Sequence, residues 1–146
     1  MLLFASVAAA ADLRFAGGIG FPGLLHAEVG WVASPRLSVE ARYNFYIFNH
    51  LFGVGATGWL LGTPRTGLPP RHALIVNGAL MVNPFAIGDG IEAGGERLPA
   101  ALTTLVGWGY TADSGFQLTA GAGPVLYVEG GPAVGLDVQV GVGWAL

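Results

Sequence analysis

The chain has 146 residues, of which 53% are hydrophobic and 10% are charged, with 25 glycines and a formal net charge of −3. Soluble domains carry roughly 25% charged residues, so the composition argues against a free-standing soluble domain, while the apolar content argues against disorder. Because the sequence contains neither lysine nor cysteine, it offers no basic patch for nucleic acid, no disulfide and no thiolate metal site.

The first eleven residues form a short apolar stretch that ends in a run of alanines. Such a stretch resembles the second half of a secretory signal peptide whose basic region is missing. We therefore expect residues 1–11 to be a truncated signal remnant, with cleavage near Ala9 to Ala11. Residues 12–146 are expected to form one domain of an exported protein.

Apolar residues recur at every second position through most of this domain. In residues 133–146, seven apolar side chains from Val134 to Leu146 alternate with small or polar ones, and residues 25–33 and 37–48 repeat the pattern. Alternation with period two is typical of strands. Strands of about 10 residues can cross a bilayer, but only when they close into a barrel that satisfies every backbone hydrogen bond.

Glycine, proline, asparagine and serine divide the domain into eight expected strands. This even number fits an all-β, eight-stranded antiparallel up-and-down transmembrane β-barrel with both termini in the periplasm and its longest connection, residues 83–99, outside. The fourth strand is the least defined, since its two faces do not separate cleanly, and the connection at 63–70 is long for a periplasmic turn. The expected strands cover residues 12–20, 24–33, 37–48, 53–62, 71–82, 100–110, 116–128 and 133–146.

Aromatic residues lie close to the ends of the expected strands. Each of the four tryptophans comes shortly before the end of an even-numbered strand, which predicts that all four reach the periplasmic membrane interface. The predicted girdle consists of Trp31, Trp59, Trp108, Tyr110, Phe116 and Trp144. At the opposite edge we expect Phe45, Phe48, Phe52, Phe85 and Tyr127.

The other strand faces carry charged, polar and glycine residues, which would point into the barrel. Buried charges persist only when they are paired, so two arginines and three acids are expected to form a network that fills the lumen. Glycine pairs in the last three strands would form a shallow wall against which these side chains lie. A narrow ion path through the same charges is the alternative. The predicted interior polar network consists of Arg14, His26, Glu28, Glu40, Arg42, Asp137 and Gln139.

These features resemble the small outer-membrane β-barrels of Gram-negative bacteria, of the OmpA, OmpX and opacity-protein type. The most specific match is the C-terminal end, where Gln139, Gly141, Trp144 and Leu146 are similar to that family's assembly signal. The family prefers a terminal aromatic residue, and Leu146 departs from this. The resemblance implies contact with outer-membrane lipid and assembly by periplasmic chaperones and the barrel-insertion machinery.

Catalytic motifs are weak in this sequence. Two matches to GxGxxG do not support a dinucleotide site: the one beginning at Gly18 contains Pro22, and the one beginning at Gly53 is followed by neither a helix nor an acidic residue near position 78. His26 and Glu28 mimic a deaminase motif whose cysteine pair is absent, and no serine, histidine and acid can be assembled at the outer rim. We therefore expect no enzymatic activity, no metal and no cofactor.

The leading hypothesis is an integral outer-membrane barrel with a plugged interior and a structural or surface-interaction role. A surface ligand of unknown nature would then bind at residues 83–99. Two alternatives stay open: a narrow, porin-like conductor of small solutes or ions, and a soluble lipocalin-like carrier with its apolar residues inward.

Overall fold

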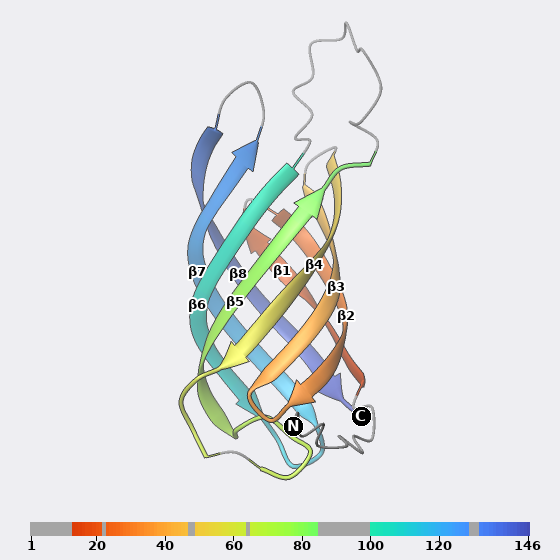
Figure 1. Cartoon of the computed structure of the whole chain (residues 1–146), viewed down its shortest axis with the longest axis vertical. Helices are drawn as coiled ribbons and strands as arrows, with labels where there is room; N and C mark the ends of the chain where they lie inside the picture. Colours follow the sequence, from red (N-terminus) through yellow and green to blue (C-terminus); the bar gives the residue numbers. More distant parts are fainter. Residues whose placement is uncertain (1–12, 22, 47–48, 64, 85–99, 129–131) are drawn as a thin grey trace, which may run out of the picture.

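In the computed structural model, eight antiparallel strands close into a single barrel, and each strand pairs with its neighbours in chain order (Figure 1). This confirms the predicted all-β, antiparallel, up-and-down barrel. The strands are β1 (Leu13–Phe21), β2 (Gly23–Ser34), β3 (Leu37–Tyr46), β4 (Asn49–Trp59), β5 (His72–Val82), β6 (Ala100–Thr111), β7 (Phe116–Val128) and β8 (Pro132–Ala145).

The structure describes residues 13–21, 23–46, 49–63, 65–84, 100–128 and 132–146. The expected signal remnant at residues 1–11, most of the connection at 83–99, and Phe48 and Phe85 lie outside the described residues. Within the described part of the chain, no helix is long and apolar enough to cross a membrane.

The first and last strands meet at one end of the barrel, where the Leu146 amide donates to the Leu13 carbonyl at 2.8 Å. This end, which we call the terminal end, also holds the β2–β3, β4–β5 and β6–β7 connections (Figure 1). The opposite end, the loop end, holds the other connections. The odd-numbered strands therefore all run from the terminal end to the loop end.

Strand β4 lies at a different position from the prediction. It begins at Asn49 rather than at residue 53, so Asn49 and His50, which were expected to form a turn, pair with Tyr46 and Phe45. The strand ends at Trp59, and the following connection is correspondingly longer. The prediction was wrong here because glycines at 53, 55 and 58 remove the contrast between the two faces of the strand.

Trp59 is consequently not part of an outward aromatic girdle. Its side chain is fully buried inside the barrel, where it packs with Ala73 and Ile75 of β5. Gly109 on β6 leaves room for the indole, since a Cβ atom at that position would lie 2.5 Å from Trp59 Cζ3. One glycine of the predicted shallow wall thus receives an aromatic ring rather than a polar group.

The polarity of the barrel wall is inverted relative to a soluble protein. Among the described strand residues, all five that carry a formal charge are buried, with no more than 6% of their surface exposed. Large apolar side chains on the alternate positions point outward, and Ile19, Val54 and Val140 are more than half exposed. The five buried charged residues are Arg14, Glu28, Glu40, Arg42 and Asp137.

We expect Gly109→Ala to lower the free energy of unfolding by about 1–3 kcal/mol, because the added methyl group overpacks the interior against Trp59. Urea unfolding followed by tryptophan fluorescence measures this change. Gly78→Ala on β5 is the matched control and should have little effect, since a Cβ atom there meets only the Thr103 carbonyl at 3.9 Å. An equal cost of Gly109→Ala in a Trp59→Leu background would contradict the proposed packing.

Candidate functional site

Four charged side chains converge inside the barrel from three neighbouring strands. Arg14 Nη1 of β1 lies 3.0 Å from Glu28 Oε2 of β2 and also 3.0 Å from Glu40 Oε2 of β3. Arg42, also on β3, pairs with Glu28 through Nη2, and its Nε lies 3.4 Å from Glu40 Oε1. The two arginines and two glutamates, which we call the ion-pair network, therefore neutralise one another.

Strand register explains how these four residues meet. Period-two alternation places Glu40 and Arg42 on the same face of β3, and antiparallel pairing sets Glu28 directly opposite Arg42. Gly30 of β2 pairs with both Arg14 and Glu40, so it lies between them. A Cβ atom at Gly30 would lie 3.0 Å from Glu40 Cβ, and its absence lets Arg14 reach across β2 to the carboxylate on β3.

Neutral polar groups donate further hydrogen bonds to the Glu40 carboxylate. Asn77 Nδ2 donates to Glu40 Oε1 at 2.7 Å, and Thr57 Oγ1 donates to the same oxygen at 3.0 Å. On the other side of the network, Arg14 Nε donates to Gln117 Oε1 at 2.7 Å. Sequence reasoning missed Thr57 and Asn77, although Asn77 is the one amide side chain in β5 and pairs with Thr57 in register.

The other predicted members of the interior network form no ion pair with these four residues. His26 is buried against two glycines, and its Nε2 would lie 3.2 Å from a Cβ atom at Gly141. Asp137 is fully buried and accepts a hydrogen bond from Gln139 Nε2 at 2.9 Å. Within the described residues, no arginine lies within ion-pair distance of Asp137. The arginines therefore form ion pairs with two of the three predicted acids, and Asp137, which is also inside the barrel, bonds to Gln139 instead.

Asp137 is separated from Arg14 by its position along the barrel. Pairing between β1 and β8 ends at Phe21 and Val138, so Asp137 lies beyond the loop end of β1, whereas Arg14 lies at the start of that strand. On its other side Asp137 pairs with Gly123 of β7, which contributes no side chain.

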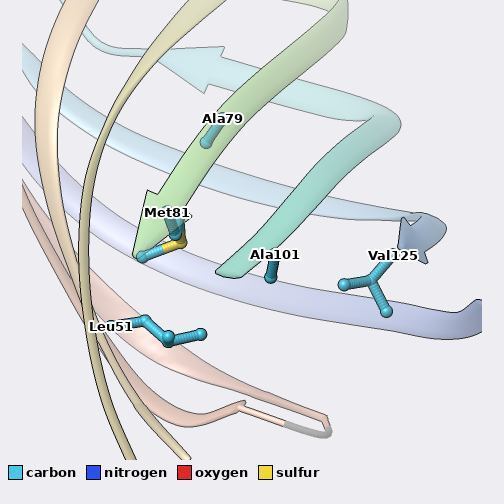
Figure 2. Close-up of a cluster of buried hydrophobic side chains, with 5 residues drawn as sticks. All are labelled: Leu51, Ala79, Met81, Ala101 and Val125. Carbon is cyan, nitrogen blue, oxygen red and sulfur yellow. The ribbon is translucent and has the colours of Figure 1, made fainter. Parts of the chain in front are cut away.

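Apolar side chains inside the barrel flank the ion-pair network at both ends. Toward the terminal end lies the cluster of Trp59, Ala73 and Ile75. On β4 and β5, Thr57 and Asn77 lie between that cluster and a second one, drawn in Figure 2, whose Leu51 and Met81 are near the loop ends of their strands. Tyr127 packs against this second cluster, so it does not belong to the predicted outer aromatic edge. The second cluster consists of Leu51, Ala79, Met81, Ala101 and Val125.

An interior cavity lies beside the ion pairs and has a volume of about 30 Å³. Its lining includes Arg14, Glu28 and Arg42 of the ion-pair network, together with His26 and Gln139. This volume is about that of a single water molecule, whereas sites for organic ligands usually measure roughly 300–1,000 Å³. Within the described residues, no three His, Asp or Glu side chains are grouped closely enough to hold a metal ion.

All six predicted girdle residues lie toward the terminal end, and all except the buried Trp59 point outward. Trp31, Trp108 and Trp144 are each between 45% and 48% exposed. The rings of Phe116 and Trp144 contact each other with centroids 5.0 Å apart, and those of Trp108 and Tyr110 lie 6.3 Å apart.

At the predicted assembly signal, Trp144 and Leu146 point outward, whereas Gln139 and Gly141 point inward. Its role in assembly stays a prediction.

The β4–β5 connection at the terminal end, residues 60–71, folds back onto the barrel; we call it the strap. Pro69 and Pro70 are fully buried. Arg65 donates to the Thr111 carbonyl at 2.7 Å and pairs with Asp113 at 2.6 Å. The strap is long for a turn because it packs these two prolines instead of linking two strands directly.

A second arginine of the strap, Arg71, binds the other carboxylate oxygen of Asp113 at 2.5 Å. The hydrogen bond and the positive charge of Arg71 hold the pKa of Asp113 below its usual range, and Arg65 adds to this effect. Both acid oxygens are thus engaged by arginine, and the carboxyl is ionised at neutral pH.

No protein-family model matches this chain, and neither a curated protein nor a solved structure is significantly similar to it. The structure confirms the architecture that the resemblance implies, a closed, antiparallel, eight-stranded β-barrel.

We expect Glu40→Gln to lower the free energy of unfolding by about 3–5 kcal/mol, because it leaves two buried arginines with a single glutamate. Chemical denaturation of the folded barrel measures the loss. Asp113→Asn is the matched control, since it also removes a carboxylate paired with two arginines, but one that is exposed to solvent. A cost for Glu40→Gln no larger than that of the control would contradict a dry ion-pair network.

Proposed function

We propose that this chain is an integral β-barrel of the bacterial outer membrane, with an interior sealed by its own side chains and a structural or surface-interaction role without catalysis. The observation that carries the proposal is the inverted polarity of the wall: the charged strand residues are buried, and large apolar side chains cover the outside. Continuous apolar surface of this kind is unfavourable in water and favourable in lipid.

The pairing of the backbone also supports a membrane environment. Every strand of the closed barrel pairs on both sides, which leaves no open sheet edge in the wall. Backbone polar groups cannot find water in the hydrocarbon region, so strands cross a membrane only in such closed arrangements. The even strand number and the outward alternation of apolar residues agree with bacterial single-chain barrels.

Aromatic side chains at both ends are consistent with two membrane interfaces. At the terminal end, Trp31, Trp108 and Trp144 face outward. Toward the loop end, Tyr43 donates to or accepts from His50 Nδ1 at 2.7 Å and packs against Phe52. Rings with one polar edge are enriched where lipid meets water.

In this proposal the terminal end faces the periplasm, and periplasmic chaperones and the insertion machinery assemble the barrel. Residues 83–99 stay the proposed site of any surface ligand.

The interior argues against the two alternative functions. A lipocalin-like carrier needs an apolar cavity large enough for its ligand, but the cavity here measures about 30 Å³ and is lined by charged side chains. A conductor needs a continuous polar path, but the ion-pair network lies between two apolar clusters. We therefore propose a plugged barrel rather than a carrier or a pore.

We expect detergent-extracted or refolded protein to migrate differently on a gel before and after boiling, because a membrane barrel resists detergent until it is heated. Protein of the same preparation denatured in urea beforehand is the control and should show no shift. Full solubility of the folded chain without detergent, together with identical migration in both lanes, would argue for a soluble barrel.

We expect the folded protein to give no discrete channel openings in planar lipid bilayers, because neutralised charges and apolar clusters fill the lumen. Arg71→Ala at the rim is the control for Arg42→Ala in the interior. Openings in the natural protein that change in size with Arg42→Ala, but not with Arg71→Ala, would favour the conducting alternative.

A further inference from the structure

An open groove of about 300 Å³ runs along the outer wall at the terminal end, between the strap and strands β5 and β6. Ala73 and Gly107 form its floor, and because their positions belong to the inward faces, that floor is backbone. Leu74 and Trp108, which pair across β5 and β6, form one wall. Leu61 of the strap and His72 line the rest.

The lining is apolar except at its terminal edge. Leu61 is 63% exposed, and Trp108 is 45% exposed, so these side chains present open apolar surface. The His72 ring lies 5.7 Å from that of Trp108 and brings polar nitrogens to the groove. The groove is large enough for part of an elongated apolar ligand.

Three arginines belong to the strap or bind it, beside this edge of the groove. Arg36 donates to the carbonyls of Trp59, Leu60 and Gly62, on either side of Leu61. Arg71 directly precedes His72, is half exposed, and uses one of its donors on Asp113. With Arg65, the described side chains here comprise three arginines and one aspartate, which leaves two positive charges. Basic residues of this kind beside an apolar surface attract anionic lipid headgroups.

We propose that this groove binds an anionic phospholipid, with an acyl chain along Leu61, Leu74 and Trp108 and the phosphate against Arg71 and His72. The inference rests on the proposed function, because a membrane-embedded barrel is what brings lipid to the outer wall. A second copy of this chain fits less well, since the described strands carry no outward acidic residue to meet the arginines.

Tryptophan quenching by brominated lipids tests the proposal at the groove itself. Trp31→Phe with Trp144→Phe leaves Trp108 as the outward tryptophan, and Trp31→Phe with Trp108→Phe leaves Trp144 as a matched probe on β8. Each protein is inserted into phosphatidylcholine vesicles that contain brominated phosphatidylglycerol or, in parallel, brominated phosphatidylcholine. We expect phosphatidylglycerol to be preferred about fivefold at Trp108, the effect of roughly one arginine, and not at Trp144.

Substitutions at the rim separate charge from folding. Arg71→Gln should abolish the preference at Trp108, while Arg71→Lys, which keeps the positive charge, should retain most of it. Gel migration before boiling confirms that each variant is folded. A preference at Trp108 that is unchanged in Arg71→Gln overturns the assignment of the headgroup.

The other outcomes are equally distinct. Equal quenching by both lipids at Trp108 and Trp144 overturns the lipid site and leaves membrane insertion intact. Quenching of Trp144 alone means that another molecule, such as a second copy, covers the groove, and it also overturns the proposal. No quenching of either tryptophan by either lipid means that the barrel is not in the membrane, so the proposed function fails as well.

Discussion

The interior of the barrel depends on Glu40, whose carboxylate is shared by both arginines of the ion-pair network. Through Arg14 and Arg42 it is linked to Glu28, and through direct hydrogen bonds to β4 and β5. Arg14 extends the connection to Gln117 on β7. Removing a single buried charge is costly, whereas a buried pair adds little net stability over apolar residues. We infer that the network selects one register among the strands rather than making the barrel unusually stable.

Most of the wall could be predicted because each strand has two contrasting faces. In β8, valines alternate with Asp137, Gln139 and glycines, and the observed strand differs from the prediction by one residue at each end. In β4, Gly53, Gly55 and Gly58 remove that contrast, so neither the start of the strand nor the direction of Trp59 could be inferred. The period-two pattern predicts the bounds and facing of a strand only where its two faces carry different kinds of side chain.

The ion-pair network was only partly accessible from the sequence, for a related reason. Period two shows that Arg14, Glu40 and Asp137 point inward, but it does not show how far along the barrel each one lies. That distance depends on how neighbouring strands are staggered when the sheet closes. Glu40 lies within reach of Arg14 because Gly30 separates them, whereas Asp137 lies past the end of β1.

The contacts that hold the strap against the barrel come from residues later in the chain. Arg65 of the strap binds the Thr111 carbonyl and Asp113, which come 46 and 48 residues later in the chain. These anchors exist only once β6 has been added beside β5. A sheet that lacks β6 therefore leaves the strap without these contacts, so the strap can be held against the terminal end only after β5 and β6 have paired.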